Sequence, residues 1–194
     1  MTDRSPCSCC AADTPDLGRR RVIRIAAAAG FASPFAALAA GDASGPQAGD
    51  RFVEEDAEGT PAPIKLSDLR PGKPVLAFPF DAKAKAARDG SRLNKVVLVR
   101  FAEGDLAAPA RGRAAGGVVA YSAICTHQGC DVKTWLSKEQ VLVCFCHSSK
   151  FQLLDDGQVA SGPALRALPS LPIRLEGDEL VAAGGFSAPP GGAV

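Results

Sequence analysis

Several residue types are scarce in this 194-residue chain, and their scarcity narrows the class of protein. The sequence holds two histidines and one residue each of tryptophan, tyrosine and methionine. Neither sign of charge is in excess, because 22 basic residues balance 21 acidic ones and leave a net charge of +1. A nucleic-acid-binding protein needs a basic surface that displaces counterions from phosphates, so we expect no nucleic-acid partner.

Glycine and proline are plentiful, at 20 and 15 residues, and 46% of the chain is hydrophobic, which is enough for one domain with an ordinary core. Short strand-like runs follow one another after residue 50, separated by turn signals, and Asp-Gly and Gly-Asp pairs mark two hairpins. The pattern predicts an all-β sandwich or barrel, with strands at 74–80, 95–101, 117–124 and 139–145 and hairpins at 150–160 and 171–183. We also expect a short helix or loop at 81–89 and a surface insertion at 104–116.

The N-terminal region has the pattern of an export leader. Arg19 and Arg20 precede an alanine-rich apolar run, residues 25–40, and resemble the twin-arginine signal. This run is shorter than the roughly 20 residues that cross a bilayer comfortably. We therefore predict a twin-arginine-type signal peptide at 1–40 and a periplasmic protein. The alternative is an uncleaved N-terminal segment that associates the protein with a membrane. After the leader we expect a linker at 41–49, a domain at 50–186 and a flexible C-terminal tail at 187–194.

The cysteines and histidines are concentrated in one short stretch. Three of the seven cysteines lie in the leader, and the other four lie with both histidines between Cys125 and His147. They form two boxes: box one is residues 125–130 (Cys-Thr-His-Gln-Gly-Cys), and box two is residues 144–149 (Cys-Phe-Cys-His-Ser-Ser). Each box can supply one thiolate and one imidazole, the ligand set of a mixed-ligand iron–sulfur centre. Cys130 and Cys146 remain and can pair as a disulfide, which suits an oxidising compartment.

The two boxes are very similar to those of the Rieske proteins of cytochrome bc complexes and related oxidoreductases. The resemblance implies an antiparallel β-sandwich or barrel with a smaller cluster-binding subdomain formed by two loops. It implies one [2Fe–2S] cluster with two cysteine ligands on one iron and two histidine ligands on the other: Cys125 and Cys144, then His127 and His147. It also implies a disulfide between Cys130 and Cys146, which Rieske ferredoxins and ring-hydroxylating oxygenases typically lack.

The resemblance places further residues around the cluster. Gln128 stands where the family usually has a large apolar shielding residue, and Ser148 stands where a glycine is usual. Phe151 replaces a tyrosine that donates a hydrogen bond to a ligand sulfur in high-potential members. Because such donors stabilise the more negative reduced cluster, Phe151 implies a lower potential. Ser149 keeps a hydroxyl that can donate to a bridging sulfide, and Pro163 belongs to a segment similar to the proline loop of the family.

The leader and the segment before box one look like those of the small subunit of arsenite oxidase. That resemblance implies an electron-transfer subunit without catalytic activity of its own. Its partners would be a large molybdopterin-containing catalytic subunit and a cytochrome c-type acceptor. The alternatives are the Rieske subunit of a quinol-oxidising cytochrome bc complex and, in another class, a redox-sensing module or a structural zinc site, since Cys₂His₂ sets also bind zinc.

Overall fold

The computed structural model describes residues 44–57 and 61–192. The predicted signal peptide, residues 1–40, lies outside the described residues. In the described part, strands dominate and helices are short, so the predicted all-β class is confirmed. None of the helices in this part is long and apolar enough to cross a membrane. Among the described residues, five short helices connect the strands: η1 (Leu66–Asp68), η2 (Arg92–Asn94), η3 (Glu103–Asp105), α1 (Ala108–Arg111) and η4 (Leu153–Asp155).

The larger sheet is antiparallel throughout, with the strand order β10-β11-β1-β2-β4-β5 and β3 paired on β2. The predicted hairpin at 171–183 is β10 with β11, joined at Gly177, whose positive φ of 63° suits the tight turn. The strands of this sheet are β1 (Arg51–Glu54), β2 (Val75–Asp81), β3 (Ala86–Ala87), β4 (Val96–Arg100), β5 (Val118–Ser122), β10 (Ile173–Glu176) and β11 (Glu179–Ala182).

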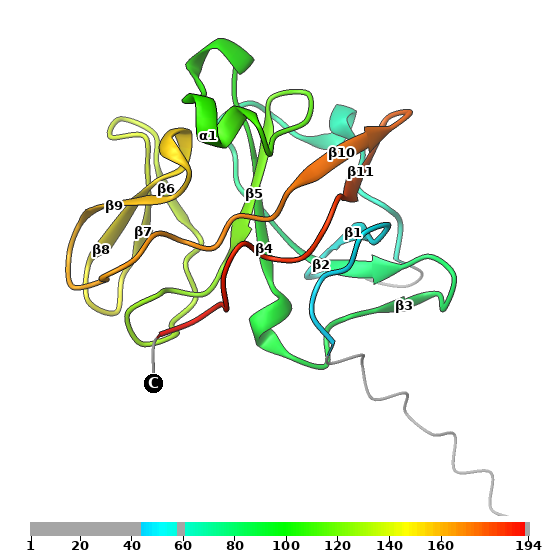
Figure 1. The fold of residues 1–194 in the computed structure, drawn as a ribbon, viewed down its shortest axis with the longest axis horizontal. Coiled ribbons are helices and arrows are strands. Elements are labelled where there is room, and N and C mark those ends of the chain that lie inside the picture. Colours follow the sequence, from blue (N-terminus) through cyan, green and yellow to red (C-terminus); the bar gives the residue numbers. More distant parts are fainter. Residues whose placement is uncertain (1–43, 58–60, 193–194) are drawn as a thin grey trace, which may run out of the picture. The chain divides into compact units, whose positions relative to one another are not determined.

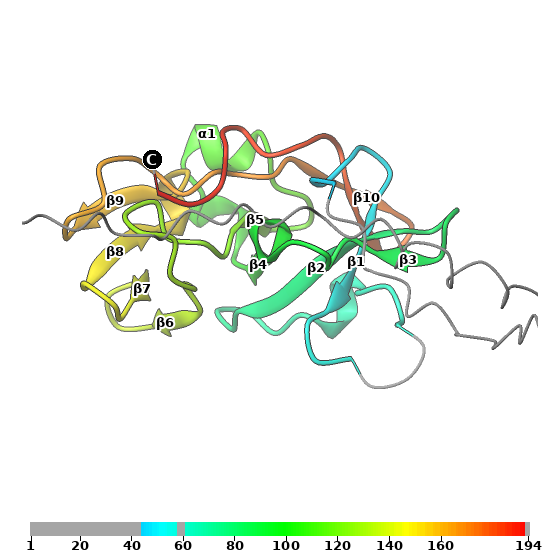
Figure 2. The same cartoon turned by 90° about the horizontal axis from the view of Figure 1, so that it is seen from below.

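The smaller sheet lies apart from β1, β2 and β3 and is drawn in yellow in Figure 1. Its order is β6-β7-β8-β9, again antiparallel, and Figure 2 shows it beside β4 and β5 from a second direction. The strands are β6 (Thr134–Leu136), β7 (Val141–Cys144), β8 (Ser149–Gln152) and β9 (Gln158–Ser161). The predicted hairpin at 150–160 is β8 with β9, so the smaller subdomain contains a four-stranded sheet as well as the two expected loops.

Strands β4 and β5 belong to two hydrophobic cores at once. Because side chains alternate across a strand, Val97 and Val99 face one core, whereas Val96 and Leu98 face the other. Both faces of these strands are therefore covered, which explains why their sequences are continuous apolar runs. Tyr121 extends the first core toward the smaller sheet, and its buried hydroxyl donates to the carbonyl oxygen of Leu153 at 2.8 Å.

Two connecting segments can be compared with their predictions. Of the helix or loop expected at 81–89, the structure has the loop: residues 82–85 form a turn, because the carboxylate of Asp81 accepts hydrogen bonds from the amides of Lys83 and Ala84 and the chain then returns as β3. The segment 104–116 is not merely a surface insertion. It contains α1, and Leu106 and Ala110 are buried in the first core.

Hydrogen bonds hold both ends of the described domain. Ser44, inside the expected linker, accepts a hydrogen bond from Arg88 at 2.5 Å, and its carbonyl oxygen accepts one from Asn94 at 2.6 Å. Arg88 is itself buried in an ion pair with Asp50, Nε to Oδ2 2.7 Å. At the other end, residues 187–192, expected to belong to a flexible tail, contact the domain: the Ser187 amide donates to the carbonyl oxygen of Ser170 at 2.8 Å.

Candidate metal centre

Three loops converge on the candidate site. Box one follows β5 and a short bridge, box two connects β7 to β8, and residues 162–166 follow β9. Box one is closed on itself, because the Cys125 amide donates to the Cys130 carbonyl oxygen at 2.7 Å and the Gly129 amide donates back to Cys125 at 2.9 Å. Box two turns between Cys144 and Ser149, which are paired in the β7–β8 register. The two boxes therefore meet as two rigid turns.

The two histidines face each other across this junction. The ring centroids of His127 and His147 lie 4.7 Å apart, and the rings are close to perpendicular, at 86°. His147 is exposed and His127 is half-buried. Within the described residues, the Nδ1 atom of His127 is buried and has no hydrogen-bond partner. A buried nitrogen without a partner is costly unless a ligand satisfies it, so this atom suits a metal.

The two predicted cysteine ligands are more deeply buried than the histidines. Cys125 and Cys144 are free and buried, each about 1% exposed, and their thiols contact each other. Burial raises the pKa of the Cys125 thiol, the Cys144 thiol adds to the rise, and the N–H groups of His127 and Gln128 oppose it by donating to the Cys125 sulfur. Two buried thiols beside two imidazoles match the mixed ligand set. The assignment of the four ligands stays a prediction.

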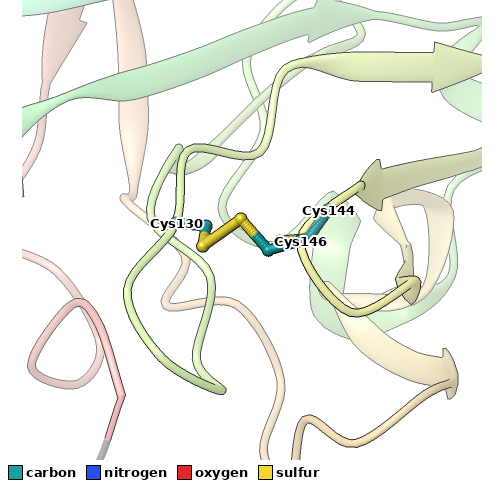
Figure 3. A group of neighbouring side chains, drawn as sticks. All are labelled: Cys130, Cys144 and Cys146. Atoms are coloured by element: carbon teal, nitrogen blue, oxygen red, sulfur yellow. A yellow bond between two sulfur atoms is a disulfide. The ribbon is translucent and has the colours of Figure 1, made fainter.

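The remaining two cysteines of the boxes are joined. Figure 3 shows the Cys130–Cys146 disulfide bridging the two loops, with Cys144 beside Cys146 at the end of β7. The Cα atoms of the bridged pair are 6.6 Å apart, within the normal range for disulfides. The sulfurs of these two residues and Cys144 lie within 4.8 Å of one another. Because the disulfide occupies two of the three sulfurs, only Cys144 of this group has a thiol to offer a metal. The predicted disulfide is confirmed.

The residues expected around the cluster occupy different environments. Ser149 is fully buried, and its Oγ accepts a hydrogen bond from the Ala164 amide at 3.2 Å, which leaves its own proton free to be donated. Phe151, two residues along the same face of β8, is fully buried in one core with Cys125 and Cys144. By contrast, Gln128 is exposed at the tip of box one. Pro163 is exposed beside His127 and lines a cavity of about 220 Å³.

The third loop lies directly against the backbone of box two. Gly162 has a φ of +94°, and a Cβ built on it would lie 2.5 Å from the Ser149 Cα atom, so only glycine fits here. Ser148 has a φ of +59°, in the left-handed region that favours glycine. This explains physically why the family usually has glycine at that position.

Two anchors of the boxes were missed in the sequence. Thr126 of box one is buried and donates from Oγ1 to the carbonyl oxygen of Arg166 at 2.6 Å. Asp131, next to box one, accepts from Lys95 at 2.8 Å and from Arg92 at 2.6 Å. Burial acts to raise the pKa of Asp131, but the hydrogen bonds from Lys95 and Arg92 outweigh it and lower the pKa below its usual value. These contacts join residues 36 to 40 positions apart, and no local motif signals them.

Comparison with known proteins agrees with this geometry. A buried thiol pair beside two facing imidazoles defines a candidate iron–sulfur electron-transfer site. The family model described as "Rieske [2Fe-2S] domain" matches residues 65–172, more than half of the chain. The protein therefore belongs to the Rieske [2Fe–2S] family and is an iron–sulfur electron-transfer protein with one [2Fe–2S] cluster.

Several curated relatives and solved structures are similar to the chain. A putative respiratory nitrate reductase Rieske subunit of Haloferax mediterranei is 35% identical over 153 residues, covering 77% of this chain and 65% of that protein. The cytochrome bc1 complex Rieske iron–sulfur subunit of Corynebacterium diphtheriae is 46% identical over 77 residues, covering 39% of this chain and 19% of that protein. The ferredoxin of carbazole 1,9a-dioxygenase from Nocardioides aromaticivorans superposes with a TM-score of 0.42 at 20% identity, over 62% of this chain and 93% of that one. The match thus spans less than two thirds of either curated relative.

The residues at the junction fit the cluster that the family implies. When bound, a [2Fe–2S] cluster accepts and donates one electron at a time. Cys125 and Cys144 would hold it from the buried side, and His127 and His147 would hold it from the side that reaches solvent. The backbone N–H groups of box one that donate to the Cys125 sulfur stabilise negative charge there. The disulfide keeps the two turns in register.

Proposed function

We propose that the protein is the electron-transfer subunit of an exported oxidoreductase and has no catalytic activity alone. It carries single electrons from a large catalytic subunit, of the molybdopterin-containing, arsenite-oxidase-like kind, to a cytochrome c-type acceptor. Cys125 and Cys144 ligate one iron of the cluster, and His127 and His147 ligate the other. The twin-arginine signal at 1–40 directs the protein to the periplasm. If that segment is not cleaved, it associates the protein with the membrane.

The observation that carries the proposal is the surface around the histidines. His147 is exposed, so electrons leave through an imidazole edge rather than through the buried thiols. Two large apolar side chains lie on the neighbouring loops, Leu165 at 97% and Phe145 at 70% exposed. Residues 125–130, 144–149 and 162–165 contain no Asp, Glu, Lys or Arg, and the guanidinium of the next residue, Arg166, donates to the carbonyl oxygens of Pro189 and Gly191. An exposed apolar surface with little charge is typical of a surface that a protein partner covers.

The second candidate is the Rieske subunit of a quinol-oxidising cytochrome bc complex. Its support is the 46% identity to the Corynebacterium subunit, which is confined to 77 residues. The relative from Haloferax matches over 153 residues and is named as a subunit of a nitrate reductase, an oxidoreductase of a different kind. The longer match favours an oxidoreductase outside the bc complexes.

Purification of the exported protein from its native host tests the proposal. We expect two irons and two acid-labile sulfides per chain, and a reduced-state electron paramagnetic resonance spectrum with the low average g-value of imidazole-ligated clusters. Stoichiometric zinc without sulfide would contradict the [2Fe–2S] cluster and favour the structural zinc site. A co-purifying subunit that contains molybdenum supports the first candidate, whereas b-type haem in the complex supports the second.

Fusion of residues 1–40 to a reporter measures export, and replacement of both Arg19 and Arg20 by Lys should abolish it.

A further inference from the structure

The C-terminal segment lies across the backbone of box one. Figure 1 shows the red end of the chain returning from β11 to the loops at the smaller sheet. A Cβ atom built on Gly192 would overlap the carbonyl oxygen of His127 and would lie 3.3 Å from the Gln128 Cα atom. Gly191 is buried, has a φ of +87°, and lies against Leu93 and Ile124. The two glycines therefore allow an approach that a side chain would prevent.

The side chain of Arg166 binds this C-terminal segment by hydrogen bonds. Its guanidinium donates to the carbonyl oxygen of Pro189 at 2.8 Å and to that of Gly191. The carbonyl oxygen of Arg166 accepts the hydrogen bond from Thr126 of box one. One residue thus joins three segments that are distant in sequence: the third loop, box one and the C-terminal segment.

We propose that residues 189–192 form a strap that holds the backbone of box one in its cluster-binding conformation, with Arg166 as the positioning residue. The strap contacts the backbone of His127 and Gln128, and the N–H groups of these two residues donate to the Cys125 sulfur. Such donors stabilise the more negative, reduced cluster, so a loosened strap lowers the reduction potential. It also makes cluster loss faster, because box one opens more readily. The inference rests on the ligand assignment made above.

Three variants of the full-length protein remove the strap in different ways. Deletion of residues 189–194 removes it, Gly192→Ala pushes it off His127, and Arg166→Gln releases its two carbonyl oxygens. We expect a lower reduction potential and cluster bleaching about tenfold faster. That factor corresponds to about 1.4 kcal/mol, near the lower end of the net contribution of one hydrogen bond to a charged group. Arg166→Lys keeps the charge but cannot hold both carbonyl oxygens, so it should resemble Arg166→Gln.

Gly104→Ala is the matched control. Gly104 lies in η3 with nothing within 4 Å of a built Cβ, so this variant should keep the wild-type potential and bleaching rate.

Amide hydrogen exchange of Cys125 and Gly129 gives a readout that needs no cluster, and it should accelerate in the three strap variants. Wild-type exchange, potential and bleaching in the deletion variant would overturn the strap. A wild-type potential in Arg166→Lys with a lower one in Arg166→Gln would assign the effect to charge and overturn the positioning role. Absence of iron and sulfide from the wild-type protein would instead contradict the proposed function, and amide exchange would still test the strap.

Discussion

The imidazole ring of His147 stands edge-on to that of His127, with the centroids 4.7 Å apart. One ring is exposed and the other half-buried, so the two are not equivalent routes for an electron. His147 is the one that a partner can reach first.

Replacement of His147 by Cys tests the ligand assignment. A thiolate adds a negative charge that neutral imidazole lacks, so a retained cluster should have a much lower potential, and the alternative outcome is loss of the cluster. Redox titration followed by visible circular dichroism measures both. His147→Cys protein with the wild-type potential would show that His147 is not a ligand.

Phe151→Tyr should raise the reduction potential. The side chain is buried in the core that contains both ligand cysteines, and a hydroxyl there can donate to a ligand sulfur. One such hydrogen bond of about 1.4 kcal/mol corresponds to about 60 mV for a one-electron couple. Phe80→Tyr on β2, which pairs with β1 and β3, is the control and should leave the potential unchanged. An unchanged potential in Phe151→Tyr with the cluster intact would mean that residue 151 does not face a sulfur.

The double replacement Cys130→Ser with Cys146→Ser should make the cluster easier to lose on heating while the sandwich stays folded. The disulfide closes a loop between residues 16 positions apart, for which chain entropy suggests roughly 3 kcal/mol. Bleaching against temperature, beside far-ultraviolet circular dichroism, separates the two events. Equal bleaching temperatures for wild type and variant would contradict a stabilising role.

Asp131→Asn should destabilise the protein near neutral pH and have little effect in acid. The hydrogen bonds from Lys95 and Arg92 lower the pKa of Asp131 in the folded state, against the opposing effect of burial. The stability from this carboxylate is therefore present above its unfolded-state pKa and is lost as the pH falls through the lower folded-state pKa. Because the carboxylate is partly exposed, at 32%, we expect a loss of only about 1 kcal/mol. Denaturant unfolding at pH 7 and near pH 2 measures the difference, and an equal loss at both would contradict the ionic explanation.

Ser148→Gly should stabilise box two slightly. A left-handed residue other than glycine costs roughly 1–2 kcal/mol, and the extra backbone entropy of glycine in the unfolded state offsets about 0.4–1 kcal/mol of that. The expected net gain is below about 1.5 kcal/mol and is measured by urea unfolding. Gly162→Ala is the opposite control, because its Cβ would meet the Ser149 backbone and should destabilise the same turn. A less stable Ser148→Gly protein would show that the serine side chain makes a contact worth more than the strain.

The strands, hairpins and boxes that follow a local sequence pattern could be predicted. The central strands were visible as apolar β-branched runs at 95–101 and 117–124, and the structure has β4 and β5 within them. The hairpins followed from Gly-Asp and Asp-Gly turns, and the boxes from cysteine and histidine spacing. The short strand β6 was not predicted, because three residues around Trp135 carry too little periodicity.

Contacts between distant segments could not be predicted in the same way. Proline and glycine after residue 187 suggested a flexible tail. Composition indicates the backbone conformations that a segment prefers, but it does not indicate which distant residue the segment contacts. The partner is Arg166, 23 residues before Pro189, and nothing local marks it as a hydrogen-bond donor to that segment. The same holds for Lys95, whose ion pair with Asp131 spans 36 residues.

Arg88 and Asn94 donate hydrogen bonds to Ser44 and so attach it to the domain. This attachment limits how far the domain can move if the leader is retained. Only residues 41–43 separate the predicted end of the leader from Ser44, and four extended backbone steps reach at most about 14 Å. In a leader-retaining form of this protein, Ser44 would stay within that distance of the end of the leader. The cluster would then change its position mainly by rotation of the whole domain about this short link.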